Sequence, residues 1–96
     1  MKFEFENKTG YNTQRLMRFL GYSLFHNAYI RRAGVSRYPR FHIYLKEKNN
    51  QILINLHLDQ KKESYQSHKA HSADYEDSFA LEKEKQRILN CLLKTS

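Results

Sequence analysis

The chain has 96 residues, of which 40% are hydrophobic, and it carries a net charge of +7 with one Pro and three Gly. This length provides one modest core, which excludes several domains, and the composition is that of a folded chain, which excludes intrinsic disorder. No apolar run reaches the roughly 18 residues of a membrane span, and the start MKFEFENK lacks the apolar stretch of a signal peptide. We therefore expect a single cytoplasmic domain, residues 1–96, without membrane contact.

Cys91 is the only cysteine, so the chain can form neither an internal disulfide nor a cysteine-based zinc site. This usage is typical of a reducing compartment such as the cytoplasm. A lone cysteine can be a catalytic thiol, but a small apolar residue that fills space on the last helix is the favoured interpretation.

The positive charge is concentrated in the first half of the chain. The first 48 residues contain ten of the 17 basic residues and three of the ten acidic ones, and no acid lies between Glu6 and Glu47. Such a surface favours a polyanionic partner, most often nucleic acid, because each neutralised phosphate releases counterions. A solvated basic face without a partner is the alternative. The basic residues between these two acids are Lys8, Arg15, Arg18, Arg31, Arg32, Arg37, Arg40 and Lys46.

The first elements in chain order are an extended arm and a helix. Residues 1–11 form the arm. Asn12 or Thr13 can cap the helix, and Gly21 can end it. The segment SLFHNAYIRRAG that follows reads either as a strand or as a continuation of the helix, and we favour the strand. The apolar face of the helix consists of Leu16, Met17, Phe19 and Leu20.

The clearest prediction is a β-hairpin over residues 41–59, FHIYLKEKNNQILINLHLD. Apolar residues alternate in both halves, and the Asn49-Asn50 pair between them suits a tight turn. A turn centred there pairs residues whose numbers add to 99, and a one-residue slip would bury charge, so the register is well specified. The apolar face then consists of Phe41, Ile43, Leu45, Ile54, Leu56 and Leu58.

The opposite face of this hairpin follows from the same register. His42 lies opposite His57, and facing Cβ atoms of such a pair are about 5 Å apart. Tyr44 then lies opposite Asn55, and Arg40 lies opposite Asp59. The register therefore predicts two facing histidines on the side of the sheet away from the core.

The last part of the chain is predicted to contain a polar loop and a helix. Residues 60–77 form the loop, which carries His68 and His71, and the helix begins at about Ser78. The whole chain is thus predicted to be a small α+β domain of order α-β-β-β-α, with an antiparallel sheet and helices packed on one of its faces.

The facing histidines suggest cleavage of RNA through its own 2′-hydroxyl. That reaction needs a base for the hydroxyl proton, an acid for the 5′ leaving oxygen, and positive charge on the phosphate. His42 and His57 can divide the first two roles, and Arg40 or Arg37 can supply the third. The alternative is that both histidines are ordinary residues on an exposed sheet face.

A metal site is the second interpretation of the histidines. In the pattern His57-x-Asp59, both ligands share one face of a strand, and a His68-x-x-His71 loop can fold back to complete the site. His42 is a fifth candidate ligand. A divalent transition metal such as zinc would suit these ligands, whereas the first interpretation requires no cofactor.

Aromatic residues are interleaved with the basic ones, as on surfaces that bind RNA. Arginines bind phosphates, and exposed tyrosine rings stack on unpaired bases. These tyrosines can equally lie at the edge of the core. A non-catalytic module in which the sheet face or edge binds a protein partner is a third interpretation. The candidate RNA-binding residues are Arg31, Arg32, Arg37, Tyr38, Arg40 and Tyr44.

The layout of residues 12–94 resembles the small toxin ribonucleases of the HicA family. LMRFLGYSL is similar to that family's first helix running into its first strand, RFHIYL to its histidine-containing strand, and ILINLHLD to the strand that follows. The resemblance implies a fold of the double-stranded-RNA-binding type and RNA binding with cleavage. It also implies that His42 is the catalytic histidine. Pro39-Arg40-Phe41 replaces the family's glycine-containing approach to that residue.

Overall fold

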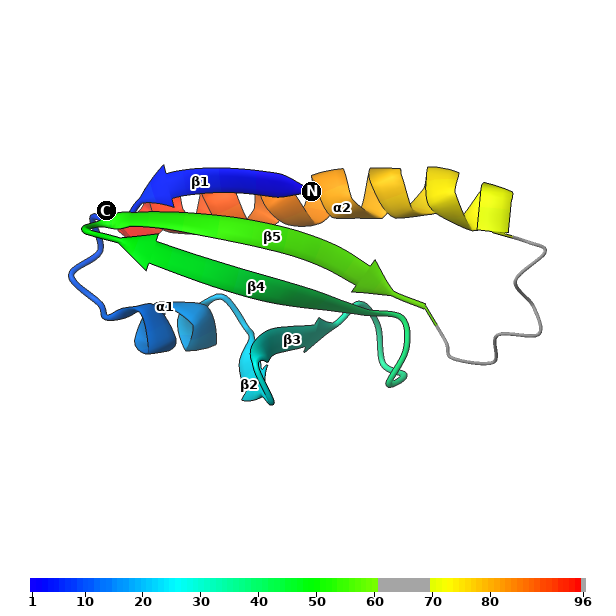
Figure 1. Ribbon diagram of the computed structural model, residues 1–96, viewed down its shortest axis with the longest axis horizontal. Helices are drawn as coiled ribbons and strands as arrows, with labels where there is room; N and C mark the ends of the chain where they lie inside the picture. Colours follow the sequence, from blue (N-terminus) through cyan, green and yellow to red (C-terminus); the bar gives the residue numbers. More distant parts are fainter. Residues whose placement is uncertain (61–69, 96) are drawn as a thin grey trace.

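The computed structural model describes the backbone of residues 1–60 and 70–95, and the side chains of residues 1–60 and 78–94. The described chain forms one antiparallel sheet and two helices, which confirms the predicted α+β class (Figure 1). The strand order across the sheet is β1-β5-β4-β3-β2. The elements are β1 (Lys2–Glu6), α1 (Thr13–Phe19), β2 (Ser23–Phe25), β3 (Ala28–Arg32), β4 (Arg40–Lys48), β5 (Gln51–Asp59) and α2 (Ala70–Thr95).

The predicted register of the central hairpin is confirmed. His42 faces His57, and the pairing continues to Lys48 opposite Gln51. The turn therefore consists of Asn49 and Asn50, and Asn49 has a positive φ of 57°. Asparagine tolerates this left-handed conformation better than most residues, which explains why the Asn-Asn pair forms the turn.

The apolar face of this hairpin forms the core together with both helices. Figure 1 shows α2 passing behind β1, and α1 at the end of the sheet where β4 turns into β5. Helices and strands contribute to one cluster, so α1 and α2 cover the same face of the sheet, as expected. The buried residues of the cluster are Leu16, Met17, Leu20, Tyr22, Phe41, Ile43, Ile52, Ile54, Leu56 and Ile88.

The predicted order α-β-β-β-α lacks two of the five strands, and the start of the last helix also differs from the expectation. Within the expected arm 1–11, Lys2–Glu6 forms β1, which extends the sheet because Phe3 and Phe5 pack against the core. The segment after α1 is extended, as favoured, but it folds into two short strands, β2 and β3. The expected loop 60–77 is shorter, since α2 begins at Ala70. The stretch 70–77 contains no large aliphatic residue, so apolar periodicity could not reveal this first part of the helix.

One carboxylate is buried between the sheet and α2. Glu84 is 4% exposed and accepts hydrogen bonds from Tyr22 Oη at 2.6 Å and from Arg87 Nε and Nη2 at 2.9 and 2.8 Å. Arg31 Nη1 of β3 lies 3.4 Å from the same carboxylate. Arg87 also donates to the carbonyl of Leu20, so this cluster joins the end of α1, β3 and α2.

The described helices contain no segment apolar enough to cross a membrane. The 26-residue α2 is long enough in principle, but charged residues occur along its length.

Candidate functional site

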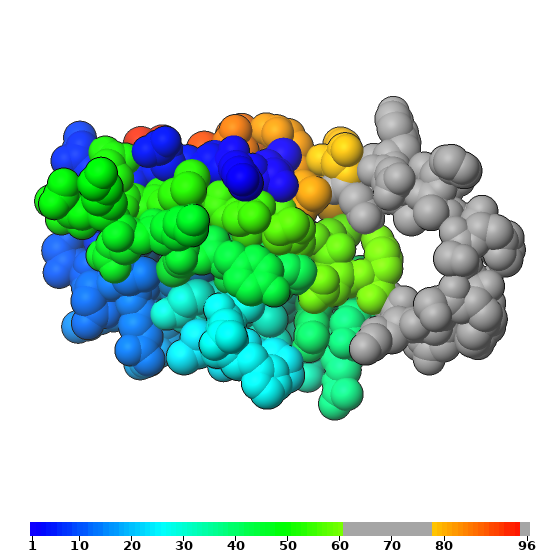
Figure 2. All heavy atoms as spheres, in the orientation of Figure 1, coloured from blue at the N-terminus to red at the C-terminus, as the bar shows by residue number. Residues whose placement is uncertain are grey.

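The face of the sheet opposite α1 and α2, which we call the open face, carries the two facing histidines. The rings of His42 and His57 stack, with centroids 4.8 Å apart and planes 15° from parallel. Tyr44 places its ring edge-on to both of them, at 5.1 and 6.1 Å. In Figure 2, atoms of β4 and β5 (green) are uncovered between β1 and the β2–β3 hairpin (cyan). The two imidazoles therefore form one contiguous group with an aromatic neighbour.

Asp59 links His42 to the neighbouring arginine. It follows His57 by two residues on the same face of β5, so it is the diagonal neighbour of His42 across the strands. Its Oδ1 lies 2.8 Å from His42 Nδ1, and its Oδ2 lies 3.5 Å from Arg40 Nε. Neither nitrogen has an aligned hydrogen-bond partner among the described residues. Catalytic contacts often align only when substrate binds.

Burial lowers the pKa of the His57 imidazole below its ordinary value of 6.5. The neighbouring His42 and the N-terminal ammonium group lower it further, whereas Asp59 acts in the opposite direction. His57 is therefore neutral at pH 7, and one ring nitrogen retains a lone pair that can accept a proton.

This lowered pKa predicts that acid destabilises the fold through His57. The unfolded chain binds a proton at His57 more readily, so this stabilising contribution is complete above pH 6.5 and is lost as the pH falls through the folded-state pKa. We expect Tm to fall between about pH 7 and about pH 5, and to fall less in the His57→Asn protein. Thermal unfolding at both pH values measures the difference. Equal falls in the two proteins would contradict this assignment.

A hollow of about 380 Å³ lies beside His42 and is lined in part by the β2–β3 hairpin. Arg40 and Asp59 line it together with His42, as do Phe25 and His26 at the hairpin turn. His26 has a positive φ of 56°, a conformation in which histidine is several-fold enriched among residues with a side chain. This third histidine is not among the site residues predicted from the sequence. The polar pair His-Asn between two short apolar runs was the available sign of a turn there.

The structure brings together some of the predicted RNA-binding residues and separates others. Arg32 lies opposite Arg40 on the open face, and Tyr44 is 49% exposed there. The Arg40 guanidinium lies 4.7 Å from the centroid of the half-buried Tyr38 ring. Arg37 is exposed in the β3–β4 connection. Arg31 does not join this group, because its strand position turns it towards Glu84.

The metal interpretation remains a prediction. His57 and Asp59 share the open face, as expected, and Asp59 lies closest to His42. His68 lies outside the described residues, and His71 belongs to α2 at a position whose side chain is not described. Among the described side chains, no group of three or more His, Cys, Asp or Glu residues is arranged to hold a metal ion.

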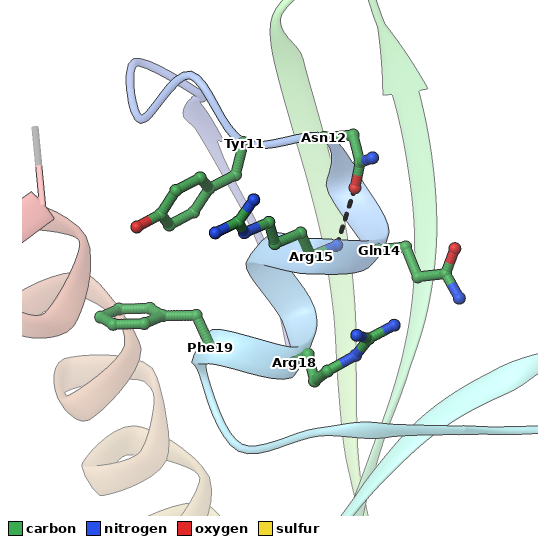
Figure 3. Close-up of a pocket in the computed structure, with 6 residues that line it drawn as sticks. All are labelled: Tyr11, Asn12, Gln14, Arg15, Arg18 and Phe19. Carbon is green, nitrogen blue, oxygen red and sulfur yellow. Dashed lines mark hydrogen bonds between the residues drawn. The ribbon is translucent and has the colours of Figure 1, made fainter.

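A second hollow, of about 640 Å³, lies along α1 (Figure 3). Figure 3 shows the Arg15 side chain beside the Tyr11 ring, and Arg18 and Gln14 on the other side of the helix. The Arg15 guanidinium lies 4.9 Å from the centroid of the Tyr11 ring. Of the described residues that line this hollow, two are arginines and none is acidic. It is therefore a second positively charged, partly aromatic surface.

The chain matches no protein-family model, and neither the curated proteins nor the solved structures give a match. The resemblance to the HicA family thus stays a prediction.

Proposed function

We propose that this protein binds RNA and cleaves it at the His42–His57 pair without a metal ion. The observation that carries the proposal is the stack of two imidazoles in which one ring contacts a carboxylate and the other has a lowered pKa. Two titratable groups in different environments can take the separate roles of acid and base. The difference in surroundings between His42 and His57 therefore supports separate roles for the two rings.

In the proposed reaction, neutral His57 is the base. It takes the proton from the ribose 2′-hydroxyl, and the 2′ oxygen attacks the adjacent phosphorus. The bond from phosphorus to the 5′ oxygen breaks, and protonated His42 gives its proton to that leaving oxygen. The products are a 2′,3′-cyclic phosphate and a free 5′-hydroxyl.

The surroundings of the two rings support this division. Asp59 Oδ1 lies 2.8 Å from His42 Nδ1, which leaves Nε2 to face the substrate. The positive charge of His42 in turn disfavours a second proton on His57, which keeps the base neutral. Arg32 and Arg40 lie next to the pair and can neutralise the charge that develops on the phosphate.

RNA affinity is expected to depend steeply on salt, because the net charge is +7 and exposed arginines occur on α1 as well as on the open face. For single-stranded RNA the logarithmic slope changes by about 0.7 for each phosphate contact, so Arg15→Ala/Arg18→Ala should reduce it by about 1.4. Fluorescence anisotropy of labelled RNA over a salt series measures the slope.

The matched control for that double variant is Lys8→Ala/Lys83→Ala. It removes the same charge from two other exposed positions. An equal change of slope in both double variants would mean that the α1 arginines make no specific contact. A slope near zero in the unmodified protein would contradict RNA binding altogether.

Cleavage itself is tested by incubating RNA with the protein in excess chelator and analysing the ends of the products. Cyclic phosphate ends in the presence of chelator support the proposed reaction. Cleavage that the chelator abolishes would instead favour the metal-dependent interpretation. The absence of both binding and cleavage would leave the protein-interaction module as the working hypothesis.

A further inference from the structure

Two aromatic residues, Phe25 and Tyr44, line the hollow beside His42. In the β2–β3 hairpin, Phe25 pairs with Ala28. The β3–β4 register pairs Tyr29 with Ile43, so one further step places Tyr44 on the other side of Ala28. A single methyl group thus separates two aromatic residues in one row across the open face, and all three residues line the hollow.

The width of this row suits one flat ring. Neighbouring strands are about 4.8 Å apart, so the backbones of Phe25 and Tyr44 are separated by about 9.6 Å. Stacked aromatic rings have centroids about 4.5 to 7 Å apart. One inserted ring can therefore contact both side chains, whereas two cannot fit. The volume of about 380 Å³ lies within the range of small-ligand sites.

Both aromatic rings are accessible and already held in place. Phe25 is 45% exposed and Tyr44 is 49% exposed. The Arg40 guanidinium lies 5.3 Å from the centroid of the Phe25 ring, and the His42 ring contacts Tyr44 edge-on. Binding to rings that are fixed in advance costs little side-chain entropy.

Polar groups at the rim can contact the edge of a bound base. Asn27, at the hairpin turn beside His26, lines the hollow, and its amide offers both a donor and an acceptor. At the other end, His42 lines the hollow too, so a nucleotide held there brings its ribose and phosphate to the proposed catalytic pair. Bases inside a duplex are stacked and paired, so only an unpaired base can enter.

We infer that this hollow binds one unpaired base of RNA between Phe25 and Tyr44, so that the substrate is single-stranded. The inference deepens the proposed function and rests on it, since it takes RNA as the ligand.

The test uses a fluorescein-labelled RNA of roughly 12 nucleotides, alone and annealed to its complement, with anisotropy as the measurement. The unmodified protein should bind the single strand at least about tenfold more tightly than the duplex. Phe25→Ala and Tyr44→Ala should each weaken single-strand binding by about tenfold and leave duplex binding unchanged. Phe79→Ala, which removes a 67% exposed ring on α2, is the matched control and should bind normally.

A third variant, Ala28→Leu, fills the space between the two rings without removing either of them and should cause the same loss. Equal affinity for the two forms of RNA would overturn the inference, as would normal binding by all three variants. Binding of a tyrosine-containing peptide in place of RNA would overturn it in favour of a protein partner.

If cleavage persists while these variants bind normally, the base site is wrong and the proposed reaction stands. If the variants lose single-strand binding but the unmodified protein cleaves nothing, the base site stands and the reaction is wrong.

Discussion

Glu84→Ala is expected to lower the free energy of unfolding by about 3 to 5 kcal/mol. The carboxylate is almost fully buried, and it accepts hydrogen bonds from Tyr22 and Arg87 and an ion-pair contact from Arg31. Its removal leaves two guanidinium groups without their counter-charge in a partly buried place. Burial also raises the pKa of the Tyr22 hydroxyl, which therefore remains a donor without its acceptor. Urea unfolding measures the loss.

Glu82→Ala is the matched control for this prediction. Glu82 lies on the same helix, is exposed, and accepts a 3.1 Å hydrogen bond from Gln86. Its replacement should change the free energy of unfolding by no more than about 0.5 kcal/mol. Similar small losses in both variants would show that the Glu84 cluster contributes little to stability. A large loss for Glu84 alone would confirm that the buried cluster makes a major contribution to stability.

His42→Ala and His57→Ala are each expected to reduce the rate of RNA cleavage by about 10² to 10⁴-fold. Each variant removes one of the two proton-transfer groups of the proposed reaction. Affinity for RNA should change little, because arginines and aromatic rings make most of the expected contacts. Single-turnover kinetics at saturating RNA separates the rate from the affinity.

Asn55→Ala is the control for these two variants. Asn55 lies opposite Tyr44 on the open face, one row from the histidine pair, and it takes no part in the proposed reaction. Its cleavage rate should equal that of the unmodified protein. An unchanged rate in either histidine variant would remove that histidine from the mechanism.

The central hairpin could be predicted because several local signals agree there. Two nine-residue strands alternate apolar and polar residues, and an Asn-Asn pair joins them. A shifted register would have buried charge, so the pairing of His42 with His57 followed from arithmetic. The diagonal contact of Asp59 with His42 did not follow, because it depends on how the side chains lean across the sheet.

Elements whose stability comes from tertiary contacts were harder to predict. The strand Lys2–Glu6 is short, and its alternating pattern alone does not predict a strand. It is stabilised by pairing with β5, which is distant in sequence, and by the packing of Phe3 and Phe5 against the core. Arg31 was placed among the RNA-binding residues from its neighbours in sequence. It faces the helices, because residues alternate between the two sides of β3. On that side it forms an ion pair with the buried Glu84 of α2. No local sequence pattern predicts that the partner of Arg31 is Glu84, which lies 53 residues further along the chain.

The hollow beside His42 could not be predicted from the sequence either. It exists because the segment after α1 folds back at His26 into two strands, which places Phe25 over the open face. In the single strand expected from the sequence, Phe25 and Ala28 would not be neighbours in one row.

The central claim is that the two facing histidines work as a catalytic pair. The most direct test is single-turnover cleavage of single-stranded RNA, in excess chelator, by the unmodified protein and by His42→Ala/His57→Ala. We predict that the unmodified protein produces 2′,3′-cyclic phosphate ends and that the double variant produces none above the rate in buffer. No cleavage by the unmodified protein, or equal cleavage by both, would contradict the claim.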